Sequence, residues 1–380
     1  MVRQGNLYPA IVTKENIKLS HSNASRNKGF YHEVQVVDSN LEYYIDDLQY
    51  LLQSKTYVPS PYERFIKTDS RKEREIFKSP YYPDRMVQWS LLQVTGPYIT
   101  KRFTADTYSA VPGRGIHLCI NNIKEALATD PYGTTYCLQC DIRKYYPSID
   151  RDILSYQYER IFKDPDILWL INSIIYNADG DKGIPIGNYF SQYSGNYHLS
   201  EFDHWIKEVV GVKYYYRYMD DIIILHHDKK FLHELRKKIE EYWYEKLHLL
   251  MKNNWQVYPV ESRGIDFIGF RMFGKYTLLR KSICLNLEDR MMKIYDKFLA
   301  GEELSYSEWC SYNSYTGWLL YCDSYRLEQK YVNPIRDYCN EYYVNKIQKG
   351  GINNGSNSQK CKINSSKRCS IYRRTACLCS

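Results

Sequence analysis

The sequence predicts an α+β protein, with helices toward both ends of the chain and short strands near its middle. Apolar residues recur at helical spacing over residues 41–53 and again over residues 86–99. Helical periodicity returns at residues 229–248 and continues, with interruptions, over residues 286–346. Between these segments lie short apolar runs that end at acidic residues or at glycines, which is typical of strands and turns.

The strongest strand signal is a pair of apolar runs that flank Asp220 and Asp221. The runs are KYYYRYM and IIIL, so we expect a hairpin with an acidic turn. A third run, TYCLQC, ends at Asp141, and GIDFIGFRMFGKY indicates a second hairpin, whereas ADGDKGIPIGN indicates a loop. One face of a further helix is marked by Leu199, Phe202, Trp205, Ile206 and Val209.

Length and composition are those of a soluble globular protein. The 380 residues include 52 Lys and Arg against 44 Asp and Glu, and the mean hydropathy is -0.57. This length allows a large core and two or three subdomains. No window approaches the roughly 18 uninterrupted apolar residues of a spanning helix, and the N-terminal residues lack the apolar stretch of a secretory signal. We therefore expect no membrane partner, a cytoplasmic location and reduced cysteines.

The positive charge of the chain is concentrated at its C-terminal end. After Glu341 there is no acid, and the eight bases there equal the formal net charge of +8. These bases are Lys346, Lys349, Lys360, Lys362, Lys367, Arg368, Arg373 and Arg374. A basic tail on a balanced body favours a polyanionic partner, and a solubilising end without fixed structure is the alternative.

The acid pair Asp220–Asp221 is the sharpest chemical signal. Two adjacent carboxylates at the tip of a buried hairpin repel each other and lose hydration, which is costly without a nearby cation. A divalent ion would remove that cost. The similar tetrapeptide Tyr44–Asp47 lies in a helical pattern, where its acids are expected on a solvated face.

Asp141 completes the proposed metal site if its strand neighbours the hairpin in one sheet. Asp141, Asp220 and Asp221 would then meet at one edge and offer the oxygen ligands that Mg²⁺ prefers. Such a cluster can hold two ions about 4 Å apart, an arrangement suited to nucleotidyl transfer. Taken alone, Asp141 could equally be a strand-end cap.

Several segments, in order from about residue 64 to residue 335, resemble the motifs of bacterial retroelement reverse transcriptases. RFIKTDSRKEREIF and YPDRMVQWSLL resemble the fingers motifs, and TADTYSAVPGRGIH resembles the segment before the palm. CDIRKYYPSID, GIPIGNYFSQ and YMDD resemble the three palm motifs, GIDFIGF the primer-grip hairpin and SYTGWLLYCDSYRL a thumb. Each segment other than YMDD would be weak alone, but the ordered set is specific.

The resemblance implies a right-hand polymerase with four parts. Residues 1–134 would form N-terminal helices and fingers, and residues 135–275 an antiparallel-sheet palm with an intervening fingers segment. Residues 276–346 would form a helical thumb and residues 347–380 a basic, flexible tail. The implied enzyme is an RNA-directed DNA polymerase that uses two Mg²⁺ ions, with Mn²⁺ as a candidate substitute, and deoxynucleoside triphosphates. The implied partners are a structured template or noncoding RNA and an RNA–DNA hybrid, with an accessory protein or self-association as further candidates.

The same resemblance assigns roles around the nucleotide. Asp141 and Asp220 would be the main metal ligands and catalytic acids, with Asp221 completing the cluster. Tyr146 matches a steric gate that excludes a 2′-hydroxyl, although an aromatic residue after a strand is more often core. The remaining nucleotide-binding candidates are Lys67, Arg74, Ile186, Gly187 and Gln192; most basic residues in a run such as that of Lys67 and Arg74 are solvated.

Primer and template contacts are implied for a second set of residues. Tyr218 and Met219 would contact the primer terminus, and a glycine-flanked Arg114 could bind template phosphate or simply lie in a surface loop. The primer grip would comprise Phe267, Ile268, Gly269 and Phe270, for which plain core is the alternative. Cys137 and Cys140 are expected to be buried strand cysteines, and the irregular spacing of Cys361, Cys369, Cys377 and Cys379 indicates a zinc site only weakly.

One departure from most reverse transcriptases bears on the biological role. Ile186 stands where Gln usually precedes Gly187, and Ser191–Gln192 replaces Ser-Pro. This pattern resembles diversity-generating retroelement enzymes, in which it accompanies mutagenesis at adenine, although Ile186 could also merely pack. A defence-associated reverse transcriptase that makes cDNA from a noncoding RNA is the near alternative. A catalytically silent RNA-binding protein with a polymerase fold is the alternative of another class.

Overall fold

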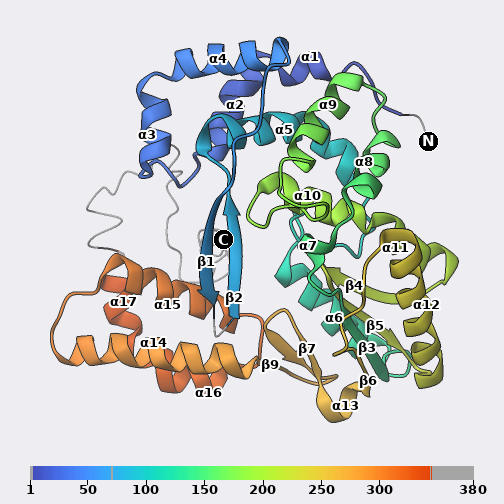
Figure 1. The fold of residues 1–380 in the computed structure, drawn as a ribbon. Helices are drawn as coiled ribbons and strands as arrows, with labels where there is room; N and C mark the ends of the chain where they lie inside the picture. The colour runs from blue at the N-terminus through green and yellow to red at the C-terminus, as the bar shows by residue number, and fades with distance from the viewer. Residues whose placement is uncertain (1–2, 70–71, 343, 345–380) are drawn as a thin grey trace. The chain divides into compact units, whose positions relative to one another are not determined.

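A computed structural model describes residues 3–69, 72–342 and 344, and the chain divides into two compact units. The first unit comprises residues 1–119 and 132–258, and the second comprises residues 120–131 and 259–380. Helices and antiparallel sheets occur in both units, which confirms the α+β prediction (Figure 1). The basic tail, residues 347–380, lies outside the described residues.

The N-terminal part of the first unit is helical. Residues 41–53 form a helix, as predicted, and Asp46 on that helix pairs with Lys14 at 2.5 Å on the surface. The acids of the Tyr44–Asp47 tetrapeptide therefore lie on a helix and not in a hairpin. The helices here are α1 (Tyr8–Ile11), α2 (Lys14–Ala24), α3 (His32–Ser39), α4 (Leu41–Gln53) and α5 (Met86–Thr100), and α2 packs against α4 and α5.

A two-stranded hairpin that the periodicity did not predict connects α4 to α5. Its strands are β1 (Glu63–Asp69) and β2 (Lys72–Lys78). The strands are rich in charged residues, so they lack the apolar alternation that marks a half-buried strand. The N–H of Phe77 in β2 donates to the carbonyl oxygen of Ile186 at 3.0 Å, which ties the hairpin to the loop predicted at residues 178–188.

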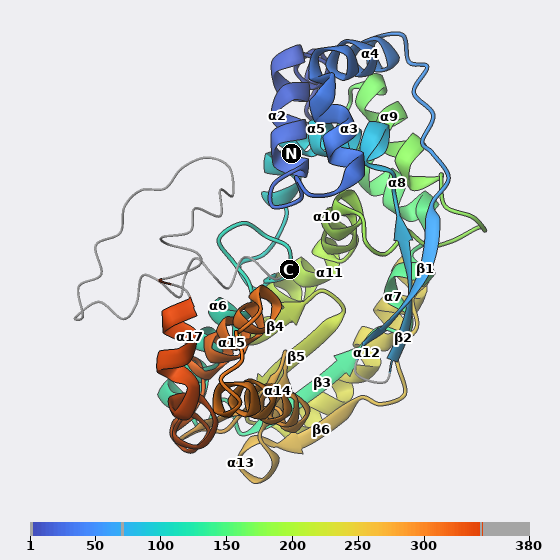
Figure 2. The same cartoon turned by 90° about the vertical axis from the view of Figure 1, so that its left-hand side faces the viewer.

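The central sheet of the first unit is antiparallel where its register is defined, and it contains the predicted strands. Its order is β4 (Tyr214–Tyr218), β5 (Asp221–His226), β3 (Tyr136–Asp141) and β6 (Gln256–Pro259). The helix α12 (Lys229–Leu247) packs against β3 and β5 (Figure 2). Apolar residues of β3 and β5 are buried on both faces of the sheet, and Cys137 and Cys140 are buried among them as predicted.

The first unit contains further helices, and one of them corrects a prediction. They are η1 (Tyr81–Arg85), α7 (Tyr145–Ser148), α8 (Arg151–Glu159), α9 (Pro165–Ile175), α10 (Tyr189–His198), α11 (Ser200–His204) and η2 (Trp205–Val209). Val209 was expected on the apolar face of its helix but is 74% exposed. The N–H of Val210 bonds to the carbonyl oxygen of Trp205, five residues back, and this wider turn rotates Val209 away from the core.

The second unit contains the predicted second hairpin and the C-terminal helices. Its sheet has the order β7 (Ile265–Phe267), β8 (Phe270–Met272) and β9 (Thr277–Leu279). The helices are most of α6 (Ile116–Thr129), α13 (Val260–Arg263), α14 (Lys281–Leu299), α15 (Tyr306–Leu319), α16 (Tyr325–Leu327), η3 (Glu328–Val332), η4 (Asn333–Ile335) and α17 (Arg336–Tyr342). In the described part of the chain, no helix has both the length and the apolar character needed to cross a membrane.

Candidate active site

Three acidic residues lie at one edge of the central sheet. Asp141, the last residue of β3, lies directly opposite Asp221, the first residue of β5. On the other side of β5, Asp221 pairs with Tyr218, so Met219 and Asp220 form a two-residue turn. Met219 has a φ of 58°, the positive value that tight hairpin turns require. The predicted convergence of residue 141 with the acidic turn is therefore present.

The electrostatics of this edge favour a bound cation. Burial, followed by the negative charges of Asp221 and Asp141, raises the pKa of Asp220 to about 7. The ionised form of Asp220 is thus held in an unfavourable environment near neutral pH. A cation placed between these carboxylates would reverse that effect.

Lys252 already supplies one positive charge at the site, and the sequence did not predict it. Its Nζ donates to Oδ2 of Asp141 at 2.6 Å, and its main-chain N–H donates to the carbonyl oxygen of Asp141 at 2.9 Å. The hydrogen bond to Asp141 raises the pKa of Lys252. The sequence offered only a faint signal, since Lys252 directly follows the short apolar run Leu249–Met251. In the structure, Met251 forms a β-bridge with Ile142, the residue after Asp141.

The carboxylate oxygens at this edge are of the type that Mg²⁺ prefers. Among the described residues, no three acidic, histidine or cysteine side chains are placed to hold one ion, but Asp141 and Asp220 interact directly. Magnesium is usually bound by one or two carboxylates together with substrate phosphates and water. Asp141 and Asp220 could hold such an ion, and Asp221 as a third ligand stays a prediction.

We expect the affinity for Mg²⁺ to increase as the pH rises through about 7. The proton on Asp220 must leave before its carboxylate binds a cation, so the ion and the proton compete at lower pH. Calorimetry in two buffers of different ionisation enthalpy should show release of about one proton near pH 6 and almost none near pH 8. Asp220→Asn should lose this pH dependence, and a flat wild-type profile would contradict the assignment.

A fully buried ion pair lies next to the acidic turn and hydrogen-bonds to its main chain. Arg217 in β4 binds both carboxylate oxygens of Asp203 in α11, with Nε to Oδ1 at 2.7 Å and Nη2 to Oδ2 at 2.5 Å. Its Nη1 donates to Oδ1 of Asn196 at 3.1 Å and to the carbonyl oxygen of Met219 at 3.0 Å. Both charged side chains are 0% exposed. Burial works against the charge, but Asp203 outweighs it and raises the pKa of Arg217. The guanidinium therefore links two helices to the turn that carries Asp220.

Comparison with known proteins assigns this chain to a family. The sequence profile for reverse transcriptase (RNA-dependent DNA polymerase) matches residues 80–272, about half of the chain. The chain belongs to the reverse transcriptase family. The match includes Asp141, Asp220 and Asp221, so the carboxylate edge lies inside the family's own domain.

Two individual proteins are similar to parts of this chain. It is 27% identical over 130 residues to nuclear intron maturase 1 of Arabidopsis thaliana, a protein described as mitochondrial. The match covers 32% of this chain and 18% of the maturase. The chain thus spans less than a fifth of that curated relative. The chain is also similar to a structure of telomerase from Candida albicans in complex with a TWJ fragment of telomeric RNA. The two chains superpose with a TM-score of 0.47 and share 11% sequence identity, and the match covers 63% of this chain and 52% of the telomerase chain. The α+β architecture is that of the right-hand polymerase fold.

The candidate steric gate lies beside the acidic turn. Tyr146 is half-buried and donates its hydroxyl proton to Sδ of Met219 at 3.4 Å. Gly195 in α10 lies next to both side chains, and an added Cβ would be at contact distance from them, 3.4 Å from Met219 Sδ and 3.5 Å from the Tyr146 ring. The neighbouring Tyr145 is buried and donates to the carbonyl oxygen of Gly195 at 2.6 Å. The structure therefore separates one tyrosine at the site from one in the core.

The other nucleotide-binding candidates lie on the hairpin and on the loop that it contacts. Lys67 and Arg74 are directly paired in the register of β1 and β2. Gly187 has a φ of 114°, and a Cβ there would lie 3.1 Å from the carbonyl oxygen of Phe77, so strand β2 itself requires this glycine. Ile186 is half-buried, and Gln192 is exposed on α10. Roles for these five residues in nucleotide binding stay predictions.

Arg114 and the predicted primer grip are engaged within the protein. Nη1 of Arg114 donates to the carbonyl oxygens of Thr104 at 2.5 Å and Thr107 at 2.9 Å, which fixes its own loop. In the second unit, Phe267 and Phe270 face each other across the hairpin and are 1% and 0% exposed, so their rings form core. Any primer contact by this hairpin, which stays a prediction, would therefore come from its turn.

The turn of that hairpin stores backbone strain. Ile268 has a φ of 38° and Gly269 a φ of 94°, and a β-branched residue in this region is a conformational outlier. We expect Ile268→Asn to raise the free energy of unfolding by about 1 kcal/mol, because Asn tolerates positive φ. Thermal unfolding of the full chain measures this. Ile268→Val keeps a β-branched side chain, so its free energy of unfolding should not rise. Equal stability of the wild type and both variants would refute the strain.

Proposed function

We propose that this chain is an RNA-directed DNA polymerase whose reaction centre is the carboxylate edge of the central sheet. The observation that carries the proposal is the register of β3 and β5, which sets Asp141 opposite Asp221 and beside the turn of Asp220. In the proposed reaction, the 3′-oxygen of the primer attacks the α-phosphorus of a deoxynucleoside triphosphate. The bond to the β-phosphate breaks, and pyrophosphate leaves.

Each residue near the edge has a distinct task in this proposal. Asp141 and Asp220 hold Mg²⁺, which when bound supplies the positive charge that lowers the barrier to phosphoryl transfer. Tyr146 closes the space beneath the sugar, and Met219, which contacts Tyr146, lies at the turn that would meet the primer terminus. Arg217 keeps the main chain of Met219 in place from inside the protein.

The direct test is primer extension on a defined RNA template with deoxynucleoside triphosphates, with and without Mg²⁺. Wild-type protein should extend the primer only with the ion, and Asp220→Ala should extend nothing while still binding RNA. Binding of RNA without extension by either protein on any template would favour the catalytically silent alternative. Extension on DNA but not on RNA templates would refute the proposed template class.

The sugar gate gives an independent prediction. Tyr146→Ala should lower the preference for deoxynucleotides over ribonucleotides by about tenfold or more, because the ring no longer excludes the 2′-hydroxyl. The ratio of kcat/KM for the two substrates measures this. Tyr145→Phe is the matched control, since it alters the adjacent, buried tyrosine and should leave the ratio unchanged. An unaltered ratio in Tyr146→Ala would remove the gate assignment.

For the biological setting we propose a diversity-generating retroelement, with a structured template RNA and an accessory protein or a second copy of the chain as partners. The support is the pattern of Ile186–Gly187 followed by Ser191–Gln192. Sequencing the RNA that copurifies with the protein is the deciding experiment. A template that matches a variable repeat, with errors at adenine in its cDNA, is the expected result. A noncoding RNA without such a repeat would favour the defence-associated alternative.

A further inference from the structure

One buried arginine holds the loop at residues 178–188. Arg151 is the first residue of α8 and is 4% exposed. Nε of its guanidinium donates to the carbonyl oxygen of Gly183 at 2.7 Å. Its Nη1 and Nη2 donate to three further carbonyl oxygens, those of Gly180 at 2.8 Å, Asp179 at 3.0 Å and Lys182 at 3.0 Å. All four hydrogen bonds therefore go to the main chain of this one loop.

A guanidinium suits this arrangement better than any other side chain. It offers five N–H donors in a fixed plane, whereas a lysine ammonium has three donors and could not serve four carbonyl groups. Burial lowers the pKa of Arg151, and the negative charge of Asp181 opposes that shift. A buried cation is costly unless its donors are satisfied, and here the carbonyl oxygens of the loop satisfy them. The loop and Arg151 thus stabilise each other.

The same loop donates hydrogen bonds to the segment that carries the candidate steric gate. Tyr146 belongs to α7, a helix of only four residues, and a helix this short leaves carbonyl groups without intrahelical partners. The N–H of Ile184 donates to the carbonyl oxygen of Tyr146 at 3.0 Å, and the N–H of Gly183 donates to that of Ile149 at 2.7 Å. The loop therefore fixes the main chain of the gate residue directly.

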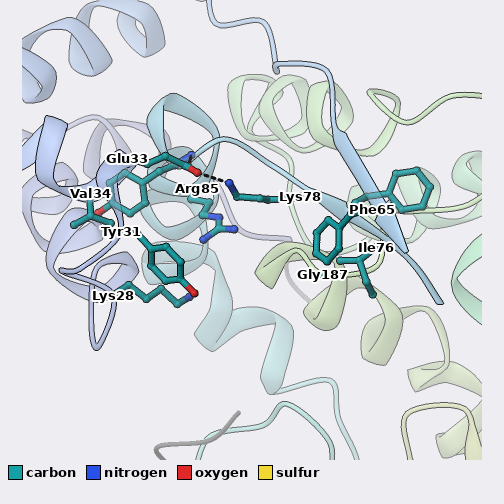
Figure 3. Close-up of a pocket in the computed structure, with 11 residues that line it drawn as sticks. Lys28, Tyr31, Glu33, Val34, Phe65, Ile76, Lys78, Arg85 and Gly187 are labelled. Atoms are coloured by element: carbon teal, nitrogen blue, oxygen red, sulfur yellow. Dashed lines mark hydrogen bonds and ion pairs between the residues drawn. The ribbon is translucent and has the colours of Figure 1, made fainter. Parts of the chain in front are cut away.

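Both ends of the loop pack closely against their neighbours. Gly183 has a φ of 89°, and an added Cβ would lie 2.9 Å from the Cα and the carbonyl oxygen of Pro147 in α7. Figure 3 shows Gly187 beside Ile76 of β2, and an added Cβ on Gly187 would lie 3.2 Å from Cγ2 of Ile76. The loop thus contacts the gate segment at one end and the β1–β2 hairpin at the other, with no room for a side chain at either glycine.

We propose that Arg151 is a positioning residue for nucleotide selection, because it holds the loop that fixes Tyr146 beneath the sugar. The inference deepens the proposed function and rests on it for the role of Tyr146. Arg151 acts through the loop and not on the nucleotide, since its guanidinium is buried and bound to main-chain oxygens. Exclusion of a 2′-hydroxyl requires placement of the ring to within about 1 Å, so a loop that is free to shift would relax it.

Sugar selectivity in primer extension on an RNA template tests this role. Arg151→Met should lower the ratio of kcat/KM for deoxynucleotides over ribonucleotides by about threefold or more, and should raise KM for the deoxynucleotide more than it lowers kcat. Arg151→Lys keeps some of the donors without the planar fork, so its ratio should lie between those of wild type and Arg151→Met. A purely structural role would reduce the amount of folded enzyme and lower the rate with both nucleotides alike. An unchanged ratio in Arg151→Met would therefore overturn the proposal.

Two control variants separate positioning from general effects. Ile45→Ala leaves a cavity at a buried residue of α4, which packs against α2, so it should lower the melting temperature without altering the ratio. Arg160→Met removes an arginine whose partner is Glu201 at the surface, and it should also leave the ratio unchanged. A ratio that falls as far in Ile45→Ala as in Arg151→Met would show that lost stability is the cause, and would overturn the proposal.

Hydrogen exchange on the full chain, without primer, nucleotide or Mg²⁺, tests the hold on the loop without catalysis. The N–H groups of Gly183 and Ile184 should be protected in wild type and should exchange about tenfold faster or more in Arg151→Met, while those of β5 keep their rates. Wild-type protection of both N–H groups in Arg151→Met would overturn the proposal. A wild-type protein that extends no primer, although its loop responds to Arg151, would instead refute the proposed function and with it the role in nucleotide selection.

Discussion

Asp220→Asn should abolish primer extension and, in the absence of divalent ions, stabilise the protein. Because we propose that Asp220 binds the metal ion at the reaction centre, its loss should lower kcat by about 10³-fold or more. The same residue has a pKa raised to about 7 by burial and by Asp221 and Asp141. Because the unfolded chain ionises this group near its ordinary value, the native state is penalised progressively from about pH 4 to about pH 7 and fully above it. Asn carries no charge and removes that penalty.

The size of the stability change in Asp220→Asn can be measured against a matched control. After allowance for solvent screening, we expect Asp220→Asn to gain about 1–3 kcal/mol near pH 8 in chelator, and little near pH 4. Saturating Mg²⁺ should raise the melting temperature of wild type but not of the variant. Asp46→Asn, in the similar tetrapeptide on α4, should change neither extension nor the response to Mg²⁺. A variant less stable than wild type at both pH values would contradict the crowding of these carboxylates.

Arg217→Met should be the most destabilising single substitution near the site. It would leave Asp203 fully buried without its cation, and loss of one partner of such a pair costs about 3–5 kcal/mol. Urea unfolding measures the change. Arg160→Met removes an arginine from an ion pair with Glu201 that is open to solvent, so it should cost less than about 1 kcal/mol. Equal costs for the two substitutions would show that burial of the Arg217 pair has been overstated.

A double variant separates folding from positioning. Arg217→Met with Asp203→Leu removes both charges, so it should recover much of the lost stability, as apolar replacements of buried pairs often do. It would still lack the hydrogen bonds to Asn196 and to the carbonyl oxygen of Met219. We therefore expect kcat to stay lower by about 10²-fold with little change in RNA affinity. Full activity in a stable double variant would restrict Arg217 to a structural role.

The secondary structure near the site was predictable because it follows local rules. The apolar runs beside Asp220 and after Thr135 are strands, and the acid pair between strands forms a tight turn. The helices at residues 41–53 and 86–99 begin and end close to their predicted bounds. The β1–β2 hairpin was missed because its charged residues carry no apolar alternation. Val209 was misplaced because the wider turn of η2 breaks the helical period.

The charges around the site were less predictable. Arg217 offered a signal, since it is a charged residue inside an apolar strand, but nothing in the sequence pointed to Asp203 as its partner. Lys252 lies 111 residues from Asp141 in the sequence, so no local pattern linked the two. The rings of Phe267 and Phe270 were assigned to a primer grip, but they pack inside the second unit.

By itself, the sequence determined which strands end in carboxylates and that one pair of acids occupies a tight turn. These properties depend on side-chain periodicity and turn preference over a few residues. Only the tertiary structure decided that Asp141 lies opposite Asp221 and that Lys252 and Arg217 supply the neighbouring positive charges. The reason is that electrostatic energies fall with distance and rise with burial, and both quantities are set by packing between segments that are far apart in the chain.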